Sequence, residues 1–434
     1  MTKFVVRGGK PLKGTIETST TKNSTVAILC ASLMIRGKVT LKDIPNIVEV
    51  DRFLEILDSI GVIVERVDDS TLVINSSAKL QMDNIHKEAC EKTRASLLFI
   101  GALASREKSY KIYKSGGCKL GARTIGPHLF ALEQFGISIV SKSKYYDVKN
   151  KSLHSADIVM YESGDTPTEN AIMAAVLAPG ETIIKFASSN YMVQDLCYFL
   201  KKAGALIEGI GTTTLKITGV KKLKSVDTYY IMPDPIVAMT WISLAVTTKS
   251  NLTVSNCPLD FLELELEKLR VMGQKYKITN VHKSRNGYFN IADILLKSSS
   301  LVALSDKIYG RPFPGLNIDN LPLFGAMLTQ ARGKTLIHDW VYENRALYML
   351  ELQKLGANVL LLDTHRVMIE GPTTLKANEV ICPPAIRPGI VILIAMIAAK
   401  GRSVLRHVYP LERGYADLIF KLRGIGVDIE RLED

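Results

Sequence analysis

The sequence predicts an α/β protein with two similar halves, and three observations support this prediction. An apolar helix end, a glycine and a strand-like alternating segment recur six times along the 434 residues. An apolar helix rich in small residues recurs in the same order. Three copies of each precede the segment Pro233-Asp234-Pro235 and three follow it, so we expect a hinge near residues 230–235.

The first recurring element is a helix that ends at a glycine. Glycine adopts positive φ without steric cost, which makes it the favoured residue just after a helix C-terminus. The residues that follow alternate between apolar and polar, as in a half-buried strand. In chain order these glycines are Gly61, Gly136, Gly204, Gly273, Gly356 and Gly426.

The second recurring element is a helix that is apolar on nearly all sides and is therefore expected to be buried. Solenoid repeats are roughly 20–50 residues long, whereas these recur about every 70 residues, so closed units that form domains are the better interpretation. The six helices include or begin near Ala27, Ser96, Ala171, Thr240, Leu323 and Val391.

Composition excludes several classes of protein. Apolar residues make up 47% and charged residues 23%, as in a folded globular protein. No apolar run is long enough to span a membrane and no signal peptide is recognisable, so we expect a cytoplasmic protein without a membrane partner. The net charge of +12 suits an anionic ligand, but no nucleic-acid-binding motif accompanies it. The cysteines and histidines lack metal-ligand spacing, so we expect no metal and no cofactor.

The most distinctive segment is a glycine-rich loop around Cys118, flanked by Lys114 and Lys119. Nearby cations stabilise a thiolate and lower its pKa. Cys118 is therefore a candidate nucleophile or proton donor. The alternative is that it is a small buried apolar residue, which is how we interpret the other five cysteines.

Basic residues lie near the ends of the buried helices. Lys22 precedes the first of them and either binds an anion at the helix N-terminus or is a solvated lysine. Arg94, Arg387 and Arg413 lie close to other buried helices, and the planar guanidinium group suits phosphate or carboxylate. Their recurrence in both halves suggests a site for a multiply charged anion.

Two further side chains have two interpretations each. Asp319 lies just before the fifth buried helix and is either a general base or the N-cap of that helix. His128 follows Pro127 and either contacts a substrate or is a packed imidazole.

Taken together, the motifs resemble those of the enolpyruvyl transferases over essentially the whole chain. The matching segments are Lys22-Asn23, Arg94-Ala-Ser, Gly116-Gly-Cys118 with Gly121-Ala-Arg123, Thr168-Glu-Asn170, Tyr342-Glu-Asn-Arg345 and Glu412-Arg-Gly-Tyr415. The resemblance implies an inside-out α/β barrel architecture with two domains of three βαβαββ-type units each. One domain would comprise residues 22–232 and the other residues 1–21 with 233–434.

The resemblance also implies an activity. The enolpyruvyl group of phosphoenolpyruvate would pass to the 3′-hydroxyl of UDP-N-acetylglucosamine through a tetrahedral intermediate, with release of phosphate, as the first committed step of peptidoglycan synthesis. We expect these two substrates as the partners of a monomer or weak homo-oligomer.

By the same resemblance, Lys22, Arg123, Arg387 and Arg413 would hold phosphoenolpyruvate. Cys118 would protonate or covalently hold the three-carbon unit, and Asp319 would take the hydroxyl proton. The resemblance thus implies that Cys118, Asp319, Lys22 and Arg413 are the catalytic residues. The sugar-nucleotide site would be lined by Asn23, Arg94, Arg123, Thr124, Ile125, Gly126, Pro127, His128, Val341 and Arg345.

Some segments depart from the family pattern. Glu162 and Asp165 stand where the family has a lysine and small residues, and Asn190-Tyr191-Met192 replaces Glu-Pro-Glu. Acids near a diphosphate weaken its binding, so we expect reduced affinity for the UDP-sugar. The alternatives are a transferase that acts on another nucleotide such as UMP, or a noncatalytic anion-binding relative.

Overall fold

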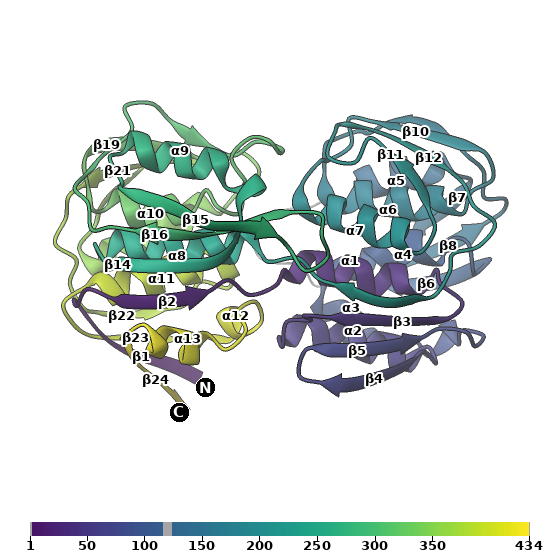
Figure 1. Ribbon diagram of the computed structural model, residues 1–434, viewed down its shortest axis with the longest axis horizontal. Helices are drawn as coiled ribbons and strands as arrows, with labels where there is room; N and C mark the ends of the chain where they lie inside the picture. Colours follow the sequence, from purple (N-terminus) through teal and green to yellow (C-terminus); the bar gives the residue numbers. More distant parts are fainter. Residues whose placement is uncertain (1, 116–123, 434) are drawn as a thin grey trace. The chain divides into compact units, whose positions relative to one another are not determined.

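The computed structural model describes residues 2–115 and 124–433, which form two compact units (Figure 1). The first, here called the 20–232 unit, holds residues 20–115 and 124–232; the second, the 233–433 unit, holds residues 2–19 and 233–433. Cys118 and Arg123 lie outside the described residues. Over the ranges described, no helix is both long and apolar enough to cross a membrane.

The 20–232 unit contains three sheets around a group of helices. In spatial order the sheets are β13 (Val226–Tyr230), β3 (Lys38–Lys42), β5 (Thr71–Asn75) and β4 (Ile63–Asp68); β6 (Ser109–Tyr113), β8 (Tyr145–Asn150) and β7 (Ile137–Ser141); and β11 (Leu206–Glu208), β12 (Thr214–Thr218), β10 (Glu181–Lys185) and β9 (Asp157–Val159). The helices are α1 (Lys22–Ser32), α2 (Val48–Ser59), α3 (Lys87–Lys92), α4 (Leu98–Leu103), α5 (Gly126–Glu133), α6 (Asp165–Val176) and α7 (Tyr191–Lys202), with 3₁₀ helices η1 (Met82–Asn84) and η2 (Arg94–Leu97).

The 233–433 unit also contains three sheets. They are β22 (Glu379–Ile381), β23 (Gly401–Arg406), β1 (Thr2–Gly8) and β24 (Asp428–Glu433); β15 (Tyr276–Lys283), β16 (Asn290–Leu296), β14 (Asn251–Pro258) and β2 (Lys13–Glu17); and β17 (Leu301–Val302), β19 (Ala331–His338), β21 (Arg366–Gly371) and β20 (Asn358–Leu361), with β18 (Ile308–Tyr309) beside β19. The helices are α8 (Pro235–Thr247), α9 (Glu263–Val271), α10 (Leu323–Leu328), α11 (Ile386–Ala398), α12 (Tyr409–Glu412) and α13 (Leu418–Gly424), with 3₁₀ helices η3 (Leu259–Phe261) and η4 (Ala346–Leu355).

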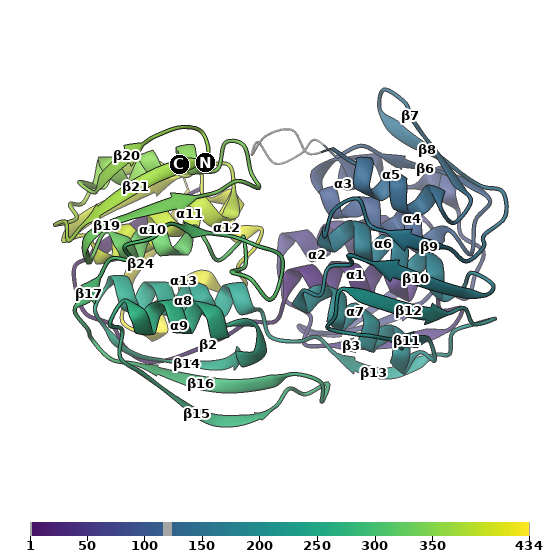
Figure 2. The same cartoon turned by 90° about the horizontal axis from the view of Figure 1, so that it is seen from above.

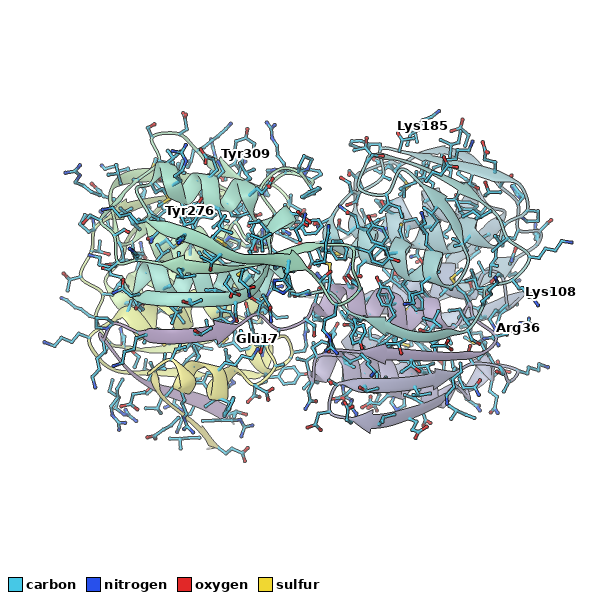
Figure 3. All side chains as sticks on the ribbon, viewed as in Figure 1. Glu17, Arg36, Lys108, Lys185, Tyr276 and Tyr309 are labelled. Atoms are coloured by element: carbon cyan, nitrogen blue, oxygen red, sulfur yellow. The ribbon has the colours of Figure 1, made fainter. Side chains whose placement is uncertain are left out.

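Each unit has its core around the apolar helices that the sequence predicts. In the 233–433 unit, α8, α10 and α11 pack on one another, and every residue of α8 is buried (Figure 2). In the 20–232 unit, α1, α4, α6 and α7 form the equivalent group. Charged side chains such as Lys108, Lys185 and Glu17 are exposed on the outside (Figure 3). The mixed α/β class is thus confirmed.

The six recurring glycines have the predicted conformation. All six have positive φ, from 83° at Gly61 to 97° at Gly204, and each precedes a strand. The first strand of the chain, β1, lies between two strands from the C-terminal end: Val5 pairs with Val404 of β23 and with Glu430 of β24. The two termini of the chain therefore belong to one sheet.

Candidate active site

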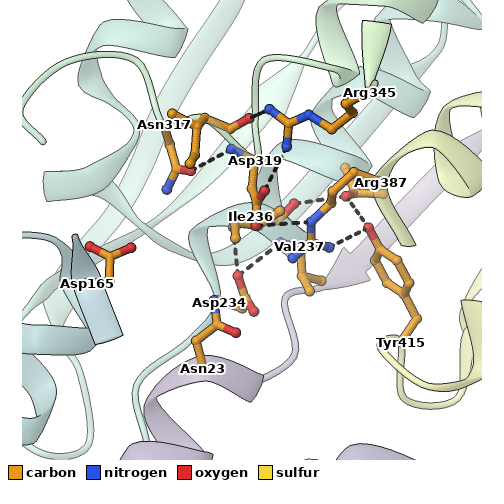
Figure 4. Close-up of polar contacts among 12 residues, drawn as sticks. Asn23, Asp165, Asp234, Ile236, Val237, Asn317, Asp319, Arg345, Arg387 and Tyr415 are labelled. Atoms are coloured by element: carbon orange, nitrogen blue, oxygen red, sulfur yellow. Dashed lines mark hydrogen bonds and ion pairs between the residues drawn. The ribbon is translucent and has the colours of Figure 1, made fainter. Parts of the chain in front are cut away.

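Asp319 lies in a tightly held turn between β18 and α10. The side chain of Asn317 accepts the backbone N–H of Asp319 at 2.9 Å (Figure 4). Glu265 of α9 accepts hydrogen bonds from the backbone N–H of Asn317 at 3.3 Å and from the Asn320 side chain at 2.8 Å. Burial raises the pKa of Glu265. The helix-capping interpretation of Asp319 is wrong, because the N-cap of α10 is Pro322.

Arg345 binds the Asp319 carboxylate from one side. Its Nη1 lies 3.0 Å from Asp319 Oδ1, Nη2 donates to the Ile318 carbonyl and Nε donates to Asp339. The guanidinium also stacks 4.2 Å from the centroid of the Tyr342 ring. Burial alone would lower the pKa of Arg345, but Asp339 and Asp319 outweigh it and raise the pKa. Arg345 is therefore a permanent cation.

Arg345, which the family resemblance places at the sugar-nucleotide site, is buried within its own unit. Its side chain is 1% exposed, and its donors are directed at two carboxylates and a carbonyl of its own unit. A guanidinium in this position orients Asp319 and has little surface for a ligand.

Arg387, on the first turn of α11, binds the other carboxylate oxygen. Its Nε lies 3.7 Å from Asp319 Oδ2, and its Nη1 donates to the Tyr415 hydroxyl at 3.2 Å. That hydroxyl also lies 2.9 Å from Thr240 Oγ1 of α8. Burial raises the pKa of Tyr415, so it stays protonated. Arg413, at the end of α12, is half-buried two residues before Tyr415.

This Asp319 cluster brings together Asp319, Arg345 and Arg387 from three separate segments of the 233–433 unit (Figure 4). The Asp319 side chain is 26% exposed, so a substrate can reach it. Each of its oxygens faces one guanidinium. The arrangement provides a proton acceptor beside a cation that suits a phosphate or carboxylate.

In the 20–232 unit, the predicted ligands Lys22 and Asn23 are the first two residues of α1 and are half-buried. The side-chain amide of Asn23 donates to the Tyr191 hydroxyl at 3.0 Å. The N-cap residue Thr21 has an extended backbone and no side-chain capping bond. The first turn of α1 therefore presents an amine and an amide side by side.

The segment after the glycine-rich loop lies beside Arg94. Arg94 Nη2 donates to the Thr124 carbonyl at 3.0 Å, and the Thr124 hydroxyl accepts the backbone N–H of Gly126 at 3.0 Å. Ile125 is half-buried and Pro127, in the first turn of α5, is buried. In the other unit, the remaining predicted residue, Val341, is exposed in the segment after β19.

His128 is a packed imidazole rather than an open ligand. It is 2% exposed, and its Nδ1 lies 2.9 Å from Asn170 Nδ2, which can only donate. Asn170 Oδ1 accepts the Gly101 N–H, which fixes the orientation of the amide. His128 Nε2 faces the Thr166 hydroxyl at 3.3 Å. Burial, with a smaller effect of Arg94, lowers the pKa of His128 to about 3.

This burial gives a testable pH dependence. The unfolded chain binds a proton at His128 below about pH 6.5, but the folded chain does so only near pH 3. Between these values we expect His128 to lower the free energy of unfolding by about 1.4 kcal/mol for each pH unit of acidification. Chemical unfolding at several pH values should show a shallower slope for His128→Asn, whereas His282→Asn, at an exposed position of β15, should keep the wild-type slope. Equal slopes in all three proteins would contradict the assignment.

Asp165 is engaged within its own unit. Its carboxylate accepts hydrogen bonds from Ser188 Oγ at 2.6 Å and from Asn190 Nδ2 at 3.2 Å. Two of the departures from the family pattern, Asp165 and Asn190, are thus partners of each other, while Glu162 is exposed.

The described cysteines are poor nucleophiles. Cys30, Cys90, Cys197, Cys257 and Cys382 are all buried. Burial raises the pKa of each thiol, to about 12 for Cys90, Cys257 and Cys382. Within residues 2–115 and 124–433, no three His, Cys, Asp or Glu side chains are grouped closely enough to hold a metal ion.

Sequence reasoning did not identify the residues that support the Asp319 cluster. Asp339 and Glu265 are buried acids that hold Arg345 and the Asp319 turn. No short motif marks them. A weak signal was available, because each is a charged residue in or beside a stretch of apolar residues.

Comparisons with known proteins give a consistent result. The family described as EPSP synthase (3-phosphoshikimate 1-carboxyvinyltransferase) matches residues 6–422. The chain is 33% identical over 433 residues to the UDP-N-acetylglucosamine 1-carboxyvinyltransferase of Treponema denticola and 32% identical over 434 residues to that of Lawsonia intracellularis, in both cases over 100% of each chain.

Two solved structures share the fold. The enolpyruvyl transferase NikO from Streptomyces tendae has a TM-score of 0.85 at 23% identity over 99% of both chains. An EPSP synthase from Acinetobacter baumannii has a TM-score of 0.76 at 16% identity over 100% of both chains.

Proposed function

Because the chain belongs to the EPSP synthase family of carboxyvinyl (enolpyruvyl) transferases, we propose that it transfers the enolpyruvyl group of phosphoenolpyruvate to the 3′-hydroxyl of UDP-N-acetylglucosamine and releases phosphate. We propose UDP-N-acetylglucosamine as the acceptor because the chain is similar over its full length, at 30–33% identity, to relatives named for that activity. This reaction is the first committed step of peptidoglycan synthesis.

The Asp319 cluster supports a defined order of bond changes. Asp319 takes the proton of the acceptor hydroxyl while the oxygen of that hydroxyl bonds to C2 of phosphoenolpyruvate. C3 gains a proton, for which Cys118 is the proposed donor. The C2–O bond to phosphate then breaks, and C3 loses a proton to restore the double bond. Arg345 and Arg387 hold the carboxylate of Asp319 in place for the first step.

We propose that four cations hold phosphoenolpyruvate, as the family resemblance implies. Arg387 and Arg413 belong to the 233–433 unit, Lys22 belongs to the 20–232 unit, and Arg123 completes the set. Phosphoenolpyruvate carries a phosphate and a carboxylate, so several cations are needed to compensate its charge. The burial of Arg387 beside Tyr415 gives one of these cations a fixed direction.

The acceptor site is assigned to Arg94 and to other residues of the 20–232 unit that the family resemblance implies. Asn23, Thr124, Ile125 and Gly126 lie on the N-terminal turns and connecting segments of the 20–232 unit and present amide, hydroxyl and backbone groups. Pro127 and His128 are buried within this segment, and the family resemblance adds Val341 to the proposed site. The engagement of Asp165 by Ser188 and Asn190 reduces the repulsion that it would exert on a diphosphate.

We also infer the finer architecture that the family resemblance implies: an inside-out barrel of six βαβαββ-type units, divided between residues 22–232 and residues 1–21 with 233–434. Six sheets over the described ranges, and six positive-φ glycines that each precede a strand, support it. A cytoplasmic monomer or weak homo-oligomer fits this function.

Phosphate release tests the proposed function. The purified protein is mixed with phosphoenolpyruvate and one of UDP-N-acetylglucosamine, UDP or UMP. We expect turnover with UDP-N-acetylglucosamine and background release with UDP and UMP. Turnover with UMP but not with UDP-N-acetylglucosamine would show that UMP is the acceptor. No phosphate release with any of the three nucleotides would favour a noncatalytic anion-binding protein.

Cys118 is the proposed reactive thiol, and the five described cysteines, which are buried, serve as its controls. Cys118→Ser should lower turnover by about a hundredfold or more, whereas Cys197→Ser and Cys257→Ser should stay close to wild type. Fosfomycin, an epoxide that alkylates the loop cysteine in this family, should add once to the wild-type protein and not to Cys118→Ser, as read by intact mass. An adduct on Cys118→Ser, or equal turnover in all three variants, would remove Cys118 from the mechanism.

A further inference from the structure

The first turn of α1 is held by α7, the helix that packs beside it. Tyr191, the first residue of α7, accepts a hydrogen bond from Asn23 at 3.0 Å. Tyr191 is completely buried, so this hydroxyl has a fixed position. Since Asn23 follows Lys22 directly, α7 contacts the turn that carries a proposed donor ligand.

One turn further along α7, Asp195 is a buried acid that accepts hydrogen bonds from residues at and just after the end of β13. Tyr229 of β13 donates to Asp195 Oδ1 at 2.6 Å, and the backbone N–H of Met232 lies 3.4 Å from Asp195 Oδ2. Burial raises the pKa of Asp195 to about 7, while Tyr229, Met232 and Ser24 favour its charged form. Ser24 is the third residue of α1.

The Met232 backbone connects this acid to Lys22. Its N–H faces Asp195, and its carbonyl accepts the backbone N–H of Thr21 at 3.0 Å. Thr21 is the N-cap of α1, so its position sets where the helix begins and where Lys22 points. Met232 is also the last residue of the 20–232 unit before the chain enters the other unit.

We propose that Asp195 is a positioning residue for the donor site, which fixes Lys22 through the backbone of Met232 and Thr21. The inference rests on the proposed function, in which Lys22 binds phosphoenolpyruvate. Tyr191 has the parallel role for Asn23 and therefore for the acceptor. Two side chains of α7 thus contact the same turn by different routes, Asp195 through the Met232 backbone and Tyr191 through Asn23.

The test compares Asp195→Asn with Tyr191→Phe. Asparagine has the shape of aspartate but lacks its charge and one acceptor oxygen, so Asp195→Asn should raise KM for phosphoenolpyruvate about tenfold and leave KM for UDP-N-acetylglucosamine within twofold. Tyr191→Phe should raise KM for UDP-N-acetylglucosamine about tenfold and leave KM for phosphoenolpyruvate within twofold, because it removes the partner of Asn23. The matched control is Glu169→Gln, a buried carboxyl of α6 in the same unit, which should leave both KM values unchanged.

Amide hydrogen exchange gives a readout that does not need the reaction. Residues 21–25 should exchange faster in Asp195→Asn than in wild type or Glu169→Gln. Should Asp195→Asn fail to fold, Tyr229→Phe removes the 2.6 Å hydrogen bond and should show the same changes in smaller measure.

The outcomes separate the two proposals. Faster exchange at residues 21–25 in a protein whose wild type shows no carboxyvinyl transfer would retain the positioning role and reject the proposed function. Unchanged exchange and an unchanged KM for phosphoenolpyruvate, in an active protein, would overturn the positioning role.

Discussion

Replacing Asp319 by asparagine is expected to lower kcat by about a thousandfold, the largest kinetic effect of any described side chain. General bases typically contribute between about a hundredfold and ten-thousandfold. Asparagine keeps the shape of Asp319 and an acceptor oxygen for Arg345, which lies 3.0 Å away, but it cannot take a hydroxyl proton. Steady-state phosphate release with saturating substrates measures the effect.

The control for this variant is Asp339→Asn. Asp339 also contacts Arg345, but it is buried and is not assigned to the substrate. Asp339→Asn should therefore lower the free energy of unfolding but reduce kcat much less than Asp319→Asn does. A kcat for Asp319→Asn within tenfold of wild type would show that another group takes the proton.

Replacing Arg345 by leucine should cost about 3–5 kcal/mol in the free energy of unfolding. The change removes the cation between Asp339, which is buried, and Asp319, and breaking one side of a buried ion pair leaves an uncompensated charge. Urea unfolding followed by circular dichroism measures the loss.

A double variant identifies the cause of that loss. Asp339→Asn combined with Arg345→Leu removes the stranded charge together with its partner, so it should be more stable than Arg345→Leu alone. A loss below about 1 kcal/mol in Arg345→Leu, or no recovery in the double variant, would show that the pair contributes little to stability.

The helices and the turns between them could be predicted because their signals are local. The apolar runs of α8 and α11 are continuous in sequence and are buried in the structure. Gly61 and the five other recurring glycines each follow a helix and adopt the positive φ that this position favours. Such patterns are contained within a few turns of chain and need no knowledge of distant partners.

The support of the candidate site could not be predicted, because it depends on pairings between distant segments. The burial of Arg345 between Asp339 and Asp319 follows from how three segments meet, which no local pattern indicates. Asp195 shows the same limit: its link to Met232 spans 37 residues and passes through a backbone N–H, which has no sequence signature. Motifs identify groups that carry chemistry, and packing decides which of them reach a substrate.

The most direct test of the proposed reaction is the structure of its product. Phosphoenolpyruvate labelled with ¹³C at C2 and C3 is incubated with the purified protein and UDP-N-acetylglucosamine, and the mixture is followed by carbon and phosphorus NMR. We expect an enolpyruvyl ether at the 3′ oxygen of the sugar with one equivalent of inorganic phosphate. Intact UDP-N-acetylglucosamine, with the label still in phosphoenolpyruvate or transferred only when UMP is supplied instead, would contradict it.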